Sequence, residues 1–136
     1  MTLLLHRQTH WPSTDLSTIL DLHWSNHREQ FVILTREDLY ILVKNVILND
    51  VLHKKSKNFR TLTSDDAQNA LFIATTNTIE EYLLSILNFS KRRNLDRENI
   101  YSLRFNSKAN QFGLIIGKFH EHKWYFEVIN RLMIRL

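Results

Sequence analysis

The chain has 136 residues and a mass of 16.3 kDa, a length that predicts a single domain over residues 1–136, with residues 1–30 as a candidate helical appendage. Apolar residues make up 43% and charged residues 24% of the sequence, a globular balance that excludes intrinsic disorder. The absence of cysteine excludes disulfides, thiolate zinc sites and cysteine nucleophiles. With two glycines and one proline, a turn-dense β-sandwich is not expected.

The positive charge is concentrated in the second half of the chain. The net charge is +4, and it arises entirely within residues 69–136, because basic and acidic residues cancel over residues 1–68. Clusters of this kind favour phosphate backbones or acidic protein surfaces over small neutral ligands. The densest clusters are Lys54, Lys55, Lys57 and Arg60, then Lys91, Arg92, Arg93 and Arg97.

The first elements are predicted as a short strand and a helix. Leu3–Leu5 is a candidate strand. Ser13 or Thr14 is a suitable N-cap for a helix that runs to about Trp24. Residues 31–34 are a short apolar run, which is either a strand or the hydrophobic lead into the next helix.

A helix over residues 36–53 is the clearest prediction. Thr35 is a good N-cap, acidic residues follow it, and apolar residues recur at helical spacing. Residues 54–64 are expected to form an exposed basic loop. The apolar positions of the predicted helix are Leu39, Leu42, Val43, Val46 and Ile47.

The next segment is predicted less sharply. Residues 66–76 fit either a helix or a buried strand, since a short apolar run does not distinguish them. A second helix is predicted from Asn77 or Thr78 to Lys91-Arg92-Arg93, with Glu80 and Glu81 near its positive N-terminal end.

The last third predicts strands. Residues 100–105, 112–119 and 124–129 alternate or are rich in aromatic and β-branched residues, and short polar segments separate them. Such short connections favour an antiparallel meander. The predicted fold class is therefore α+β, with helices packed on one face of a small antiparallel sheet of three to four strands that lie mainly near the C-terminus. No internal repeat is visible.

Several function classes are excluded or unsupported. No glycine-rich phosphate loop and no Gly-x-Ser-x-Gly motif occurs, so nucleotide-cofactor enzymes and α/β-hydrolases are not expected, and no cofactor is predicted. The histidine pairs lack a third ligand, so no metal site is predicted. With no long apolar run and no signal-peptide pattern, we expect a cytoplasmic protein without a membrane span. The histidine pairs are His6 with His10, His23 with His27, and His120 with His122.

One segment resembles a known family. Residues 104–116 read RFNSKANQFGLII, which is a strand, a polar turn and a second strand. This segment resembles the C-terminal hairpin of small ribonuclease toxin domains of the barnase–EndoU–colicin–RelE-like group. The upstream sequence from Glu80 to Leu83 is similar to the helix that often precedes that hairpin.

The resemblance implies metal-independent RNA cleavage, or a derivative that has lost this activity. A general base such as His120, His122 or Glu127 would activate a ribose hydroxyl, while Arg104 and Lys123 would stabilise the charge that develops on the phosphate. The following strand departs from the family pattern, which leaves open whether the chain is an enzyme. A toxin, antitoxin or phage-related role would follow.

The leading hypothesis is a basic nucleic-acid-interacting protein, most simply one that binds RNA. The alternatives are a non-enzymatic protein-interaction module (an inhibitor, immunity or anti-defence factor) that binds an acidic partner surface, and a homo-oligomeric structural protein that associates through residues 128–136. The candidate nucleic-acid-binding residues are Lys54, Lys55, Lys57, Arg60, Lys91, Arg92, Arg93, Arg97, Lys108 and Lys118.

Overall fold

The structure is a computed structural model that describes residues 19–26, 29–36, 38–43, 46–50, 58–85, 88–95 and 99–131. These residues form eleven β-strands and two short 3-10 helices. No α-helix occurs within the described ranges, so the α+β prediction is wrong and the fold is nearly all β.

The strands form three small sheets, and each sheet is an antiparallel meander in chain order. Sheet 1 consists of β1 (Ile19–Ser25), β2 (Gln30–Thr35), β3 (Leu39–Val43) and β4 (Val46–Asp50). Sheet 2 consists of β5 (Thr61–Asp65), β6 (Ala70–Ala74), β7 (Thr78–Leu83) and β8 (Asn88–Asn94), with the 3-10 turn η1 (Asp66–Gln68) between its first two strands. Sheet 3 consists of β9 (Ile100–Asn106), β10 (Gln111–Lys118) and β11 (Lys123–Asn130), with η2 (Phe119–Glu121) between its last two strands.

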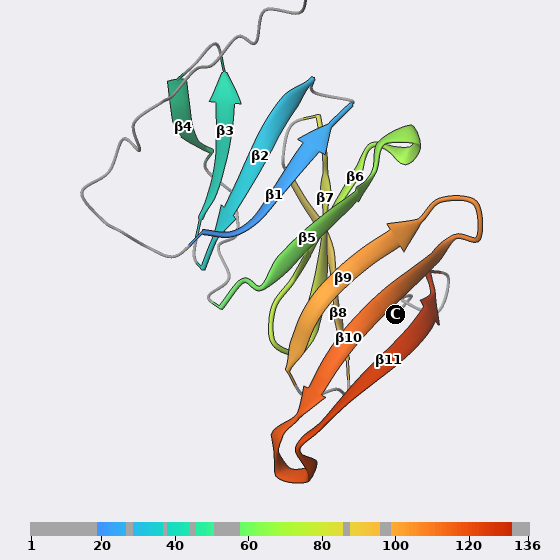
Figure 1. The fold of residues 1–136 in the computed structure, drawn as a ribbon. Coiled ribbons are helices and arrows are strands. Elements are labelled where there is room, and N and C mark those ends of the chain that lie inside the picture. Colours follow the sequence, from blue (N-terminus) through green and yellow to red (C-terminus); the bar gives the residue numbers. More distant parts are fainter. Residues whose placement is uncertain are drawn as a thin grey trace, which may run out of the picture.

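The three sheets stack face to face in chain order (Figure 1). Their first strands, β1, β5 and β9, lie side by side in the middle of the molecule (Figure 1). We call the face of a sheet that points toward the next sheet in the chain its forward face, and the opposite face its rear face. We call the edge where β1, β5 and β9 meet the inner rim.

The first core lies between the forward face of sheet 1 and the rear face of sheet 2. Both sheets contribute fully buried aliphatic residues, and Tyr82 closes the core from β7. Burying aliphatic side chains of this size stabilises the fold by about 1.5–3 kcal/mol each. The core residues are Val32, Leu34, Leu39, Ile41, Phe59, Leu62, Leu71, Ile73, Tyr82 and Leu84.

The second core lies between the forward face of sheet 2 and the rear face of sheet 3. Phe72 is central, because its ring meets the ring of Phe112 edge to face at 4.7 Å. Strand β6 contributes to both cores, and all five of its residues are buried. The second core contains Ala70, Phe72, Ala74, Ile79, Ile100, Leu103, Phe112, Leu114 and Ile116.

The predicted helix over residues 36–53 is wrong, because this segment contains strands β3 and β4. Both faces of β3 are covered, since Leu39 and Ile41 are buried in the first core and Tyr40, between them, is also only 9% exposed. A strand covered on both faces has a continuous apolar sequence, in which every helical spacing is satisfied by chance.

The predicted helix from Thr78 to Arg93 is also wrong. The segment contains β7 and β8, which pair so that Glu80 lies opposite Arg92 and Glu81 opposite Lys91. The two glutamates therefore pair with cations across a hairpin and do not lie at a helix N-terminus. The carboxylate of Glu80 is fully buried, and it accepts hydrogen bonds from Arg92 Nε at 2.8 Å and from the Tyr82 hydroxyl at 2.7 Å. Burial and the bond to Glu80 raise the pKa of Tyr82.

The other predicted elements have mixed outcomes. The C-terminal strands are confirmed as β9, β10 and β11, and the run at residues 31–34 is strand β2. Residues 66–76 contain the short turn η1 and then the buried strand β6. The N-terminal helix is wrong at its described end, where Ile19–Ser25 is strand β1. The candidate strand Leu3–Leu5 and the helix start lie outside the described residues.

A backbone repeat links the three sheets, although no repeat was visible in the sequence. Glu29, Asn69 and Asn110 each precede the second strand of a sheet, and all three have positive φ angles of 53–54°. Asn58 and Asn99 lie shortly before β5 and β9, with φ angles of 66° and 50°. Asparagine adopts the left-handed conformation more readily than most residues, so it replaces glycine at these turns. The low glycine content therefore does not exclude a turn-rich β fold.

We expect Arg92→Ala to lower the free energy of unfolding by about 3 kcal/mol, because it leaves the buried Glu80 carboxylate without its cation. Urea denaturation measures this change. The matched control is Lys91→Ala on the same strand, whose Nζ lies 4.0 Å from Glu81 and whose side chain is half exposed. We expect a loss below about 1 kcal/mol for the control, and equal losses in the two variants would contradict this assignment.

Candidate interaction surface

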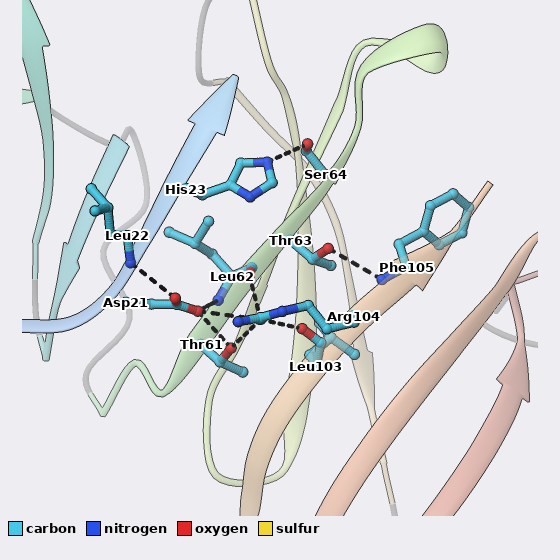
Figure 2. Close-up of polar contacts among 10 residues, drawn as sticks. All are labelled: Asp21, Leu22, His23, Thr61, Leu62, Thr63, Ser64, Leu103, Arg104 and Phe105. Carbon is cyan, nitrogen blue, oxygen red and sulfur yellow. Dashed lines mark hydrogen bonds and ion pairs between the residues drawn. The ribbon is translucent and has the colours of Figure 1, made fainter. Parts of the chain in front are cut away.

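The inner rim is held together by one arginine from sheet 3. Figure 2 shows the Arg104 guanidinium reaching from β9 past β5 toward Asp21 on β1. Its Nη1 donates to Thr61 Oγ1 and to the Leu62 carbonyl, each at 3.1 Å, and lies 3.4 Å from Asp21 Oδ2. The same Asp21 oxygen accepts a hydrogen bond from the Thr61 hydroxyl at 2.8 Å. Arg104 therefore connects the first strands of all three sheets.

His23 forms a second polar link between sheets 1 and 2. Its Nε2 lies 2.7 Å from Ser64 Oγ (Figure 2). Ser64 Oγ in turn donates to Asp66 Oδ1 at 3.3 Å, an arrangement in which His23 Nε2 is the donor. Burial lowers the pKa of His23, an effect that nearby Asp66 and Asp21 oppose and Arg104 reinforces. The lowered pKa favours the neutral imidazole.

The predicted catalytic residues do not gather at one place. Arg104 lies opposite Gly113 on β10, whereas His120, His122 and Lys123 lie in and beside the β10–β11 connection. Gly113 and that connection are separated along β10 by roughly 17 Å at 3.3 Å per residue. Glu127 lies opposite Leu114, in the middle of β11. The side chain of Arg104 is engaged in the inner rim, where it performs a structural task.

The predicted nucleic-acid-binding residues are distributed over two sheets and opposite ends of sheet 3. Lys91, Arg92 and Arg93 lie on β8, Lys108 lies in the β9–β10 turn, and Lys118 lies at the far end of β10. Several of them are engaged within the chain. Arg92 pairs with Glu80, Lys91 with Glu81 and Lys118 with Glu121, while the Arg60 guanidinium lies 5.0 Å from the Tyr101 ring centre. The predicted residues Lys54, Lys55, Lys57 and Arg97 lie outside the described residues.

A polar pocket of about 450 Å³ lies at one end of the contact between sheets 2 and 3. It is lined by two cations, Lys91 and Arg131. Arg131 is 20% exposed, donates to Asp65 Oδ2 at 2.9 Å and lies 3.6 Å from Glu81 Oε1. The guanidinium also lies 5.0 Å from the Phe72 ring centre. Both cations of the pocket therefore already have carboxylate partners within the chain.

The forward face of sheet 3 is an exposed apolar surface. On β11, Trp124, Phe126 and Val128 are 63%, 68% and 54% exposed, and Ile115 on β10 is opposite Phe126. These residues share one face because alternate side chains of a strand point the same way. Tyr125, Glu127 and Ile129 point to the other face, where Ile129 packs against the second core.

The backbone of sheet 3 fixes this apolar face. The ring of Trp124 meets that of Tyr101 edge to face at 4.8 Å, directly over Gly117. A Cβ at Gly117 would lie 3.0 Å from the Tyr101 ring, so this contact depends on glycine. Beside Phe126, a groove of about 330 Å³ runs over Gly113, between Arg104 and Val128. The face therefore combines a close-packed aromatic pair with a concave feature.

The rear face of sheet 1 has a second exposed apolar surface along β1 and the start of β2, whereas Ile33 and Tyr40 on the same face are each only 9% exposed. Leu22, Trp24 and Phe31 are 58%, 45% and 40% exposed. Trp24 and Phe31 are cross-strand partners whose rings meet edge to face at 5.0 Å. His23 and Val32 alternate with them and point to the forward face.

These two apolar faces were missed from the sequence, although a signal was present. Trp124, Phe126 and Val128 stand at every second position, which is the spacing of one strand face. The strand was predicted, but the sequence gives no sign of which of its two apolar faces another sheet covers.

Two further observations bear on function. Among the described side chains, no group of three or more histidine, cysteine, aspartate or glutamate residues could hold a metal ion. None of the helices in the described ranges has the length and hydropathy that crossing a bilayer requires.

No protein-family model matches the chain, and no curated protein matches it in sequence. Among solved structures, the chain is similar to the β-propeller domain of Myceliophteria thermophila Cps50 (Swd1), with a TM-score of 0.57 and 12% identity over 90% of this chain. It is also similar to the computationally designed Ika4 protein, with a TM-score of 0.46 and 9% identity over 93% of this chain and 100% of that one. The extracellular domain of the hybrid two-component system BT4673 from B. thetaiotaomicron has a TM-score of 0.43 and 12% identity over 86% of this chain and 22% of that one.

The first likeness shows a β-propeller-like fold, in which each meander corresponds to one blade. This finding corrects the expectation of an α+β, ribonuclease-like domain. The chain spans 40% of the length of that propeller domain.

We expect the stability of the protein to fall as the pH drops below about 6.5, because His23 is neutral in the folded state and takes up a proton more readily when unfolded. The folded pKa lies below the unfolded value, so the penalty is absent at pH 7.5 and grows as the pH falls toward the folded value. His23→Gln removes this contribution. Thermal unfolding midpoints between pH 7.5 and pH 5 measure it, and parallel curves for the two proteins would contradict this account.

Proposed function

We propose that the chain is a non-enzymatic protein-interaction module, and that the forward face of sheet 3 is its contact surface. The observation that carries this proposal is the exposed apolar set Trp124, Phe126, Val128 and Ile115. Contiguous exposed apolar side chains are a feature of protein interaction sites. Tryptophan and aromatic anchors also supply much of the binding energy in protein interfaces.

A cation lies at one edge of this surface. Lys108 is exposed in the β9–β10 turn, beside the end of the groove that Asn106 and Gln111 line. The Lys118 ammonium, by contrast, pairs with Glu121 and lies over the Tyr125 ring on the other face. Charges at the edge of an interface steer association and select for opposite charge in the partner. The partner surface that fits best is therefore apolar at its centre and acidic at its rim.

A catalytic or RNA-binding role has less support. The residues predicted for RNA cleavage lie at separate places, and Arg104, which was expected to stabilise phosphate charge, is bonded to the inner rim. Many of the basic residues already have acidic or aromatic partners in the chain. The cytoplasmic location stays a prediction from the sequence.

The test is photo-crosslinking in the cells that produce the protein. A benzophenone amino acid replaces Phe126 on the forward face, and the matched control places it at Ser90, an exposed position on β8. We expect a discrete protein adduct from position 126 and none from position 90. The captured protein, once identified and purified, should bind the wild-type chain and lose at least tenfold in affinity with Val128→Glu, while Ser90→Glu has no effect.

The proposal fails if position 126 gives no protein adduct, or if both positions give the same adducts. It also fails if the purified chain binds mixed RNA with an affinity that falls steeply with salt, because such a slope reports several neutralised phosphates.

A further inference from the structure

The three sheets stack in the same way, each with its forward face against the rear face of the next sheet, and the two outer sheets each keep an exposed apolar surface. The forward face of sheet 1 packs on the rear face of sheet 2, and the forward face of sheet 2 packs on the rear face of sheet 3. Among the described residues, two exposed apolar surfaces then remain, the β1 side of the rear face of sheet 1 and the forward face of sheet 3. These are the two complementary halves of the contact that the chain already makes twice.

From this we infer that the forward face of sheet 3 binds the rear face of sheet 1 of a second copy of the chain. The inference rests on the proposed function and identifies the partner of that same surface. The contact joins two different patches, so it is heterologous and leaves one free patch on each copy unless a ring closes.

Two copies are the number that closes such a ring. Propellers close with about four to eight sheets arranged around an axis. The described residues of each copy form three sheets. A pair of copies would therefore form a ring of about six sheets in which both apolar faces of each copy are covered.

The side chains on the two faces suit each other. On the forward face, the groove over Gly113 is a concave site beside Phe126. On the rear face, Leu22 and Trp24 project as exposed large side chains from β1. A bulky side chain from β1 of the second copy would fill the groove, in the same way that residues of neighbouring sheets interlock in the two internal cores.

The charges at one rim are also complementary. Within the chain, the β1–β2 turn meets the β5–β6 turn, where the backbone N–H of Asn26 donates to Asp66 Oδ2. The same repeat places the β9–β10 turn of one copy beside the β1–β2 turn of the next. Lys108 is exposed in the β9–β10 turn and Glu29 in the β1–β2 turn. In the proposed contact, a cation of one copy therefore lies beside an anion of the other.

The test uses two variants that each damage one face. Phe126→Glu places a charge on the forward face of sheet 3 and leaves the rear face of sheet 1 intact. Leu22→Glu places a charge on the rear face of sheet 1 and leaves the forward face of sheet 3 intact. Both residues are exposed, so each variant should retain its fold, which circular dichroism and thermal unfolding check. Multi-angle light scattering on the full chain then gives the mass of each protein and of an equimolar mixture.

We expect wild type and the control Ser90→Glu to have twice the 16.3 kDa mass of one chain. Each face variant alone should be monomeric, and their mixture should again give a dimer, because one intact forward face meets one intact rear face. A monomeric wild type, an assembly larger than two copies, or dimers that only one of the variants disrupts would each overturn the inference.

A cross-linking measurement covers the case in which a glutamate variant fails to fold. The chain has no cysteine, so Phe126→Cys and Leu22→Cys each introduce a single thiol. A short bismaleimide should link the two variants to each other far more than either to itself, and equal self-linking would overturn the inference. A monomeric wild type that still captures a different protein from position 126 would refute this inference and leave the proposed function standing.

Discussion

Each sheet of this protein is apolar on both faces, and a sheet of that kind must be covered twice. Sheet 2 shows the solution, since Phe72 and Ile73 are neighbours on β6 and are buried in different cores. The hydrophobic effect acts on each face separately, so the sheets stack in series and do not close on a single core. Sheet 3 is then left with one exposed face, and sheet 1 with an exposed apolar strip along β1 on its rear face. The stacking order, the exposed aromatic residues and the proposed self-association all follow from this constraint.

Polar contacts fix the order in which the stacked sheets meet. Apolar faces alone would allow neighbouring sheets to slide, because the hydrophobic effect is non-directional. At the inner rim, Asp21 and Arg104 bond to groups on β5 from opposite sides. His23 and Ser64 add a second link between sheets 1 and 2. An arginine chosen from the sequence as a stabiliser of phosphate charge thus acts within the protein, where its donors hold three strands in register.

The sequence predicts the part of this fold in which periodicity is informative. Strands β9, β10 and β11 were found because their residues alternate and polar turns separate them. The segment of β3 fits a helix pattern because burial on both sides removes the alternation that identifies a strand. The segment of β7 does so because Glu80 and Glu81 stand where a helix carries acidic residues in its first turn. The repeat escaped notice because it is carried by backbone conformation, with Glu29 at a position where Asn69 and Asn110 stand in the other sheets. The alternation of apolar residues in the sequence predicts that they share one face of a strand. It does not predict whether another sheet packs on that face.

The most direct test of the stacked, two-faced sheets is carbene footprinting of the wild-type chain at rising protein concentration. In dilute solution the label should react strongly with Trp24 and Phe126 and only weakly with Phe72, which is 2% exposed between two sheets. As the concentration rises, labelling of Trp24 and Phe126 should fall together, because each covers the other in a neighbouring copy. Strong labelling of Phe72, or protection of one outer face without the other, would contradict the account.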